Sequence, residues 1–236
     1  TAIPGWEQSS KPDQVALVLS SAKKHSMKVF LGLSFSEEWL SKQAKDKAWL
    51  TEHAASMKLV ASDLYQKFYA SYPDTFAGWY INWEMDNVAG YNTDPVQKET
   101  MTAALKEVVD HLHGLNPQLP VSLSPYFHAK KGATAEEWKS FWQEMVQKTG
   151  LDILILQDGV GVGRASLDDL PTWFKGVCDG VHAAGGQCWD DLEIFSGQSA
   201  VNNPAPTERI IQQIETAAPY VDKIVSFSFN VSMSPE

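Results

Sequence analysis

The chain has little cysteine and little arginine. Its two cysteines, Cys178 and Cys188, form neither a disulfide framework nor the paired CxxC spacing of a zinc site. We expect both to be small buried packing residues, with a disulfide across a separation of ten positions as the alternative. Arg164 and Arg209 are the only arginines and the formal net charge is −10, so we expect no nucleic-acid partner bound through its phosphates.

Long apolar runs are also absent. The longest, such as Leu151–Leu156, have the length of a strand, whereas a membrane helix needs roughly 20 residues. We therefore expect no membrane-spanning segment. The first residues, from Thr1 to Trp6, lack the basic and then apolar order of an export signal, so any such signal is missing from this sequence.

The chain does contain a regular alternation of helical and strand-like segments. Apolar periodicity predicts helices over about 12–25, 45–71, 95–115, 135–148, 167–184 and 207–217. Strand patterns occupy 27–34, 77–84, 121–126, 152–157, 187–194 and 223–230. Strict alternation predicts a parallel sheet within one α/β domain that spans residues 1–236.

Polar residues end nearly every predicted strand, and this favours a (β/α)8 TIM barrel over the alternative, an open doubly wound sheet. A barrel gathers functional groups from the carboxyl ends of many strands, whereas an open sheet concentrates them at one switch point. Six strands do not close an eight-stranded barrel. We therefore expect a longer parent protein to supply two further N-terminal strands, the helix between them and a last helix.

Two predicted strands carry a glutamate on the face that should point to the barrel axis. Because side chains alternate along a strand, Tyr80, Asn82 and Glu84 share one face of segment 77–84. A purely structural strand would place apolar side chains there, so the polar face indicates a function. On segment 187–194 the corresponding face carries three residues: Trp189, Asp191 and Glu193.

Glu84 and Glu193 are the candidate catalytic pair. Cleavage of a glycosidic bond needs one carboxyl group to protonate the leaving oxygen and another to attack the sugar or activate water. We expect Glu84 to be the acid/base and Glu193 the nucleophile of a retaining hydrolase, with Asp191 or Asp158 as the alternative second carboxylate. The remaining candidate substrate contacts are Tyr80, Asn82, Asp86, Tyr126, Gln157, Asp158, Trp189, Asp191 and Asn230.

Aromatic residues and a glycine-rich loop complete the predicted rim. Most of the nine tryptophans should be core residues, but a few rim aromatics can stack on sugar rings. The glycines at 159, 161 and 163 follow Asp158, lack the spacing of a nucleotide-binding motif, and are interpreted as a loop. The candidate stacking residues are Trp39, Tyr91, Tyr126 and Phe127.

The sequence lacks the residues that other enzyme chemistries require at strand ends. No lysine stands at the carboxyl end of a predicted strand, which disfavours a Schiff-base aldolase, and one histidine near a strand end does not make a zinc site. We expect no metal and no cofactor. A carboxylate-bound Mg²⁺ or Ca²⁺ is the alternative, and its candidate ligands are Glu84, Asp86, Asp158 and Asp191.

Four sequence blocks, at 78–87, 155–161, 189–195 and 218–230, resemble a bacterial TIM-barrel family of unassigned function that is described as glycoside-hydrolase-like and is often exported. The resemblance implies a TIM barrel, a carbohydrate substrate and export to the periplasm or beyond, with lipid anchoring through an upstream N-terminus. A looser similarity links the chain to retaining barrel glycosidases, whose acid/base directly follows an asparagine; here Trp83 separates Asn82 from Glu84. A non-catalytic carbohydrate-binding barrel is the alternative function, and the sequence makes no prediction of oligomeric state.

Overall fold

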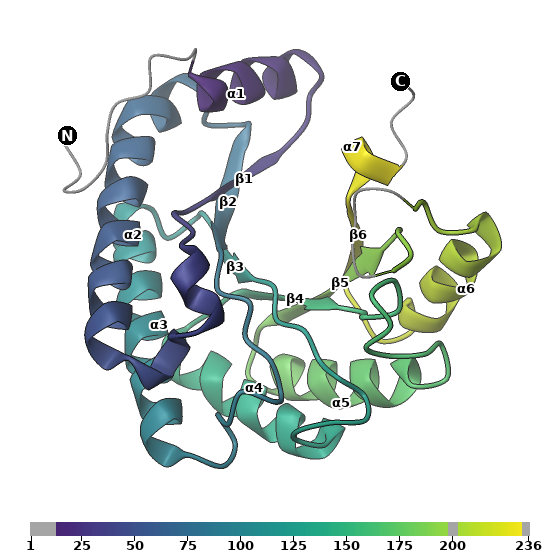
Figure 1. Cartoon of the computed structure of the whole chain (residues 1–236). Coiled ribbons are helices and arrows are strands. Elements are labelled where there is room, and N and C mark those ends of the chain that lie inside the picture. The colour runs from purple at the N-terminus through teal and green to yellow at the C-terminus, as the bar shows by residue number, and fades with distance from the viewer. Residues whose placement is uncertain (1–12, 198–202, 233–236) are drawn as a thin grey trace.

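The computed structural model describes residues 13–197 and 203–232, and its centre is a curved parallel sheet. Neighbouring strands pair in chain order, from β1 to β6, and every pairing is parallel. Figure 1 shows the sheet curving like a half-barrel, with α2 to α6 on its outer side. The strands are β1 (Val29–Gly32), β2 (Phe76–Ile81), β3 (Val121–Leu123), β4 (Ile153–Gln157), β5 (Gln187–Glu193) and β6 (Lys223–Phe227).

The predicted alternation of strands and helices is confirmed. Two helices have the predicted bounds, α3 (Pro95–Leu115) and α6 (Thr207–Ala217), and α3 begins where the Asp94 carboxylate accepts the Val96 N–H. The other α-helices are α1 (Gln14–Lys24), α2 (Lys47–Phe68), α4 (Ala135–Thr149), α5 (Leu170–Ala183) and α7 (Phe229–Ser232). Short 3₁₀ helices are η1 (Glu37–Leu40), η2 (Gln43–Lys45) and η3 (Tyr69–Ser71).

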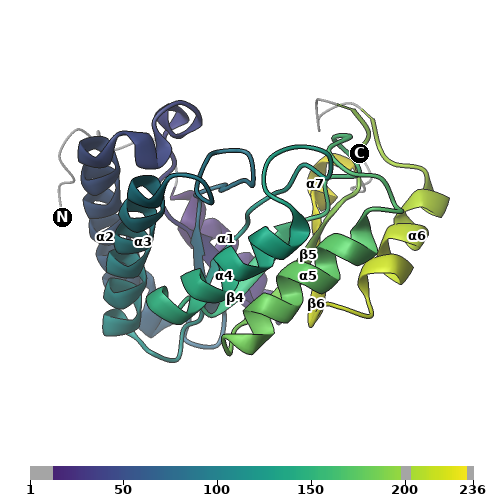
Figure 2. The same ribbon diagram turned by 90° about the horizontal axis from the view of Figure 1, so that it is seen from below.

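The strand order excludes the open doubly wound alternative for the described residues. A doubly wound sheet reverses its strand order at a switch point and carries helices on both faces. Here the order is sequential, and α4 and α5 lie side by side along the outer face (Figure 2). In the same described part, no helix is long and apolar enough to cross a membrane.

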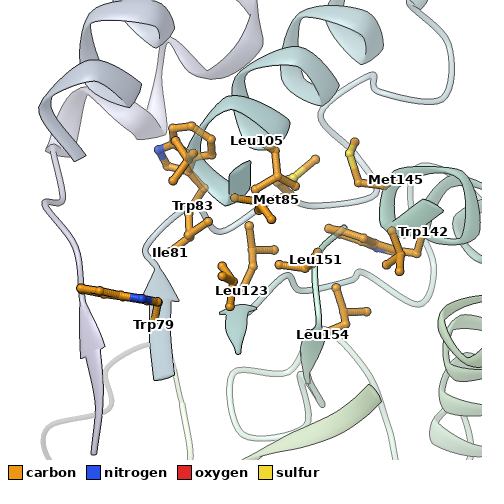
Figure 3. Close-up of a cluster of buried hydrophobic side chains, with 14 of the residues drawn as sticks. Trp79, Ile81, Trp83, Met85, Leu105, Leu123, Trp142, Met145, Leu151 and Leu154 are labelled. Carbon is orange, nitrogen blue, oxygen red and sulfur yellow. The ribbon is translucent and has the colours of Figure 1, made fainter. Parts of the chain in front are cut away.

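The main core lies between the sheet and the outer helices. From β2, Trp79 and Ile81 point into this layer and are fully buried. Figure 3 shows Leu105 of α3 close to Met85, while Trp142 and Met145 of α4 lie beside the next strands. Most of the tryptophans have the core role that the sequence analysis expected. The buried ones are Trp39, Trp79, Trp83, Trp138, Trp142, Trp173 and Trp189.

A smaller apolar cluster fills the inner face of the sheet near the amino ends of its strands. Ile153, Ile155 and Trp189 are its buried members, and Phe30 and Val225 pack against them. The Trp189 ring lies 5.9 Å from the Phe30 ring, and the Lys223 ammonium lies 4.1 Å above Trp189. This layer closes the floor beneath the carboxyl ends of β4 and β5.

Cys178 and Cys188 form a disulfide, with their Cα atoms 5.3 Å apart. The expectation of two free packing thiols is therefore wrong, and the alternative holds. Both side chains are buried, and the bond links α5 to the second residue of β5. The strand that carries Asp191 and Glu193 is thus fastened covalently to the outer helical layer.

Candidate active site

A cavity of about 210 Å³ opens at the carboxyl ends of the strands. It brings together five of the predicted site residues, from β2, β4 and β5 and from the loop after β2. These are Tyr80, Glu84, Gln157, Asp191 and Glu193. Four residues that are not among the predicted site residues complete the lining: Val162, Arg164, Phe195 and Phe227.

Glu193 is the most firmly held carboxyl group of the cavity. It is the last residue of β5 and only 4% exposed, and its Oε2 accepts the Val162 N–H at 2.7 Å. The glycine-rich loop can come this close because Gly161 has no Cβ. A Cβ at this position would lie only 2.7 Å from the Glu193 Cβ. The loop glycines thus let the backbone approach a catalytic candidate.

Burial raises the pKa of Glu193 to about 7, and the neighbouring Asp158 carboxylate adds to the rise. The Val162 N–H and the Arg164 charge oppose it. Glu193 is therefore able to change protonation state near neutral pH.

Helix α6 holds the backbone at Glu193 from behind. The Glu193 carbonyl oxygen accepts a hydrogen bond from Arg209 Nη2 at 2.9 Å and from Gln213 Nε2 at 3.4 Å. Arg209 also donates to the Phe195 carbonyl, so one guanidinium supports two residues that line the cavity. These contacts fix the main chain from which the Glu193 side chain projects.

Asp191 is a second carboxyl group on the same inward face of β5. Its Oδ2 accepts the Ser124 hydroxyl at 3.2 Å, and burial raises its pKa to about 7. The Tyr80 hydroxyl interacts with Ser124 as well, and burial together with the Asp191 charge raises the pKa of Tyr80. Gln157 Nε2 donates to the Ser124 carbonyl at 3.2 Å, which places an amide beside this group.

Glu84, predicted as the last residue of a strand over 77–84, lies three residues beyond the end of β2. The strand ends at Ile81, and the next buried side chain, Trp83, stacks on Trp39 with ring centroids 5.7 Å apart. Trp39 Nε1 donates to the Glu84 carbonyl at 3.2 Å. The Glu84 side chain itself is solvent-exposed at the cavity mouth. Desolvation by the surrounding protein raises the pKa of Glu84, and the Arg164 charge opposes the rise.

Three predicted substrate contacts are placed elsewhere. Asp158 is fully buried and turns toward α6, where Gln213 donates to it, so it does not line the cavity; burial raises its pKa to about 6. Trp189 belongs to the inner apolar cluster with Ile153 and Ile155, because it lies four residues before Glu193 on the same strand. Asn82 lies beside Gly32 of β1, and its Oδ1 is buried without a hydrogen-bond partner among the described residues.

Asp86 and Tyr126 form a pair next to the cavity and are absent from its lining. The Tyr126 hydroxyl donates to Asp86 Oδ2 at 3.2 Å, and Asp86 is 6% exposed. Burial, with the Asp86 charge, raises the pKa of Tyr126 to about 12. The predicted strand through Asn230 is wrong, because β6 ends at Phe227 and Asn230 lies in α7; its side chain is outside the described part.

The expected sugar-stacking residues are mostly core residues. Trp39 stacks on Trp83, Phe127 stacks on Trp173 at 4.4 Å, and Tyr91 donates its hydroxyl to Gln43 at 3.0 Å. All three rings are no more than 1% exposed. The aromatic side chains that do reach the cavity are Tyr80, Phe195 and Phe227.

The alternative metal site is not assembled in the described ranges. The proposed ligands separate, because Asp158 turns to α6 and Asp86 to Tyr126, while Glu84 and Asp191 line the cavity. Within residues 13–197 and 203–232, no group of three or more His, Cys, Asp or Glu side chains has the arrangement to hold a metal ion.

Sequence reasoning missed Arg164, Phe195, Phe227 and Val162 for different reasons. The scarcity of arginine was a usable signal for Arg164, since a lone cation next to a strand end in an acidic chain is conspicuous. Phe227 has no such signal, because the predicted substrate contact Asn230 lies on the opposite face of segment 223–230 by strict alternation. In the structure, Val225 and Phe227 face inward.

The parallel half-barrel, with carboxyl groups gathered at the carboxyl ends of its strands, has a glycoside-hydrolase-like fold. Residues 6–236 match the family described as a domain of unknown function, DUF4434, and the chain belongs to that family. The resemblance seen in the sequence is thereby confirmed. No curated protein matches the chain.

Solved structures of glycosidases share this fold. One is a Bacteroides thetaiotaomicron protein provisionally assigned as an alpha-L-fucosidase, with a TM-score of 0.81 and 21% identity over 98% of this chain and 71% of that one. Another is TsXylA, an intracellular xylanase of Thermoanaerobacterium saccharolyticum, with a TM-score of 0.60 and 11% identity over 99% of this chain and 76% of that one. At these identities the likeness establishes the fold alone.

Proposed function

We propose that this chain is a glycoside hydrolase that cleaves a poly- or oligosaccharide, and that its half-barrel belongs to a TIM barrel. One observation carries the proposal: Glu84 and Glu193, from two separate strand ends, line the same small cavity. The similar structures support it, because one is assigned as a fucosidase and the other is a xylanase that has been crystallised with xylotetraose.

In the proposed mechanism, Glu193 is the nucleophile and Glu84 the acid/base. A Glu193 carboxylate oxygen bonds to the anomeric carbon as the glycosidic C–O bond breaks, and Glu84 gives its proton to the leaving oxygen. Glu84 then takes a proton from water, whose oxygen attacks the same carbon and releases Glu193. The net reaction adds one water molecule across the glycosidic bond.

The way each carboxyl group is held supports this assignment. The Val162 N–H occupies Glu193 Oε2, which leaves Oε1 for attack and opposes the rise in the pKa of Glu193 that burial causes. Glu84 stands at the exposed mouth, where leaving group and water can both reach it, and its raised pKa favours the protonated form. Asp191, Tyr80 and Gln157 offer hydrogen bonds to sugar hydroxyls from the cavity wall.

We also propose that the protein works outside the reducing cytoplasm. The Cys178–Cys188 disulfide supports this location, because such bonds persist in oxidising compartments. Labelling of free thiols in protein isolated from its host, before and after reduction, tests the point. Two reactive thiols before reduction would contradict it.

The activity itself is tested with a panel of polysaccharides and aryl glycosides. The parent protein, Glu84→Gln and Glu193→Gln are compared with Glu215→Gln, which alters an exposed glutamate of α6. We expect turnover by the parent and by Glu215→Gln, and a loss of at least about 100-fold in kcat/KM for the two site variants.

The roles are separated by two further measurements. Azide should restore activity to Glu193→Ala, and the first product, followed by NMR, should retain the anomeric configuration of the substrate. An inverted product would overturn the retaining assignment. Tight sugar binding without turnover by the parent would instead favour a carbohydrate-binding module.

A further inference from the structure

A second pocket, of about 460 Å³, adjoins the candidate active site and is basic. It shares Val162 and Arg164 with the first cavity, so the two open next to each other along the rim. No carboxylate lines it, although the whole chain has 29 acidic against 19 basic residues. Its lining consists of His128, Lys130, Lys131, Val162, Gly163 and Arg164.

The loop that carries the two lysines is held in one conformation by Asn87, which is 4% exposed. Asn87 Nδ2 donates to the carbonyl oxygens of Lys131 and Ala133, each at 2.8 Å. Its Oδ1 accepts the His128 N–H at 2.9 Å. Gly132 has a φ of +71°, and a Cβ there would collide with the Asn87 carbonyl oxygen. The loop is therefore built around a buried side chain.

Arg164 is positioned just as firmly on the other wall of this basic pocket. Its guanidinium lies 3.8 Å from the centre of the Tyr126 ring, which the hydrogen bond to Asp86 fixes in turn. The Arg164 carbonyl oxygen accepts the Ala129 N–H at 3.0 Å, which joins the two walls. Stacking uses the face of the guanidinium and leaves the N–H groups at its edge for a ligand.

These cations are not neutralised by ion pairs. In the described ranges, no ion pair involves Arg164, Lys130 or Lys131. Longer-range charge interactions remain: Arg164 acts on Glu84 and Glu193 across the rim, and Lys130 acts on Asp169, whose Oδ2 already accepts hydrogen bonds from Ser166. Three positive charges around one concave site favour an anion with several oxygens.

We propose that the basic pocket binds an acidic substituent of the polysaccharide, a carboxylate or a sulfate ester, on a sugar unit next to the scissile bond. The inference rests on the proposed hydrolase function, because the substrate chain must pass from the first cavity into the second. Arg164, which borders both, holds the acidic group, and Lys130 and Lys131 hold its outer oxygens. The substrate class is thus an anionic glycan.

The test measures binding, so that it does not depend on turnover. Glu193→Gln is applied to an array of uronate-containing and sulfated oligosaccharides, each paired with its methyl-esterified or desulfated counterpart. We expect one acidic class to bind at least about 10-fold more tightly than its neutral partner at low salt, with the difference shrinking as salt rises. The class that binds distinguishes a carboxylate from a sulfate.

The double variant Lys130→Gln/Lys131→Gln is then compared with Lys45→Gln/Lys47→Gln, which removes two exposed charges elsewhere. We expect the first to weaken binding of the acidic glycan roughly 3- to 30-fold and to leave its neutral partner unaffected. Equal affinity for acidic and neutral partners, or equal loss in both double variants, would overturn the inference. If acidic glycans bind but the parent protein shows no turnover, only the proposed hydrolase activity is refuted.

Discussion

The two strand ends that carry the proposed catalytic glutamates are supported in different ways. After β2, the stacked rings of Trp83 and Trp39 fix the backbone at Glu84, and the carboxyl group is exposed. After β5, Glu193 is buried, Val162 binds its carboxylate and Arg209 binds its carbonyl. The apolar support leaves a side chain free to turn between leaving group and water, whereas the hydrogen-bonded support fixes one that must attack from one direction.

Removing the apolar support should have the largest effect. Trp83→Ala deletes a fully buried indole that also donates to His53 Nδ1 at 3.2 Å, so we expect the free energy of unfolding to fall by about 3–5 kcal/mol. Trp49→Ala is the matched control, because Trp49 also packs on Trp39 but is only half-buried. Urea denaturation measures both. Equal losses would mean that burial of Trp83 is not what supports this strand end.

Crowding the other support should have a smaller effect. Gly161→Ala places a Cβ 2.6 Å from the Phe195 carbonyl oxygen, and we expect a loss of about 2–3 kcal/mol, together with displacement of Glu193 and loss of activity. Gly114→Ala is the control, because nothing lies within 4 Å of that position in α3. It should raise stability by about 0.5–1 kcal/mol. Normal activity of Gly161→Ala would contradict the close packing of the loop.

The pH dependence of stability that Glu193 causes should be a smaller effect than either substitution. The folded pKa of Glu193, about 7, lies above its ordinary value of 4.5, so the folded state binds more protons between those values. The contribution of Glu193 to the free energy of unfolding should therefore be fully present below pH 4.5 and be lost as pH rises through 7. At pH 8 we expect Glu193→Gln to be more stable than the parent by about 1–2 kcal/mol.

Glu84→Gln sharpens the same comparison. Desolvation also raises the pKa of Glu84, but the residue is exposed to solvent, so the variant should change the pH dependence of thermal unfolding far less than Glu193→Gln does. Thermal melts from pH 4 to pH 8 measure both variants. An equal effect at the two positions would remove the distinction between the exposed and the buried glutamate.

Much of this architecture was accessible from the pattern of residues. The helix bounds of α3 and α6 followed from apolar periodicity. The inward face of β5 followed from strict alternation of side chains. The ends of β2 and β6 were predicted too far along, because Asn82 to Glu84 and Ser228 to Asn230 have strand-like composition but lie beyond the last parallel pairing.

By itself, the sequence determined which elements form and which side chains share a face, because both depend on local repeats along the chain. The tertiary structure decided how deeply each side chain is buried and which residues from different loops come into contact. Trp189 and Glu193 share a face, yet at about 3.3 Å per residue they lie roughly 13 Å apart along β5, so one enters the floor and the other the cavity. Arg164 meets Glu84 and Glu193 only because loops remote in sequence converge at one rim. Such convergence depends on strand pairing and loop packing, which no local repeat encodes.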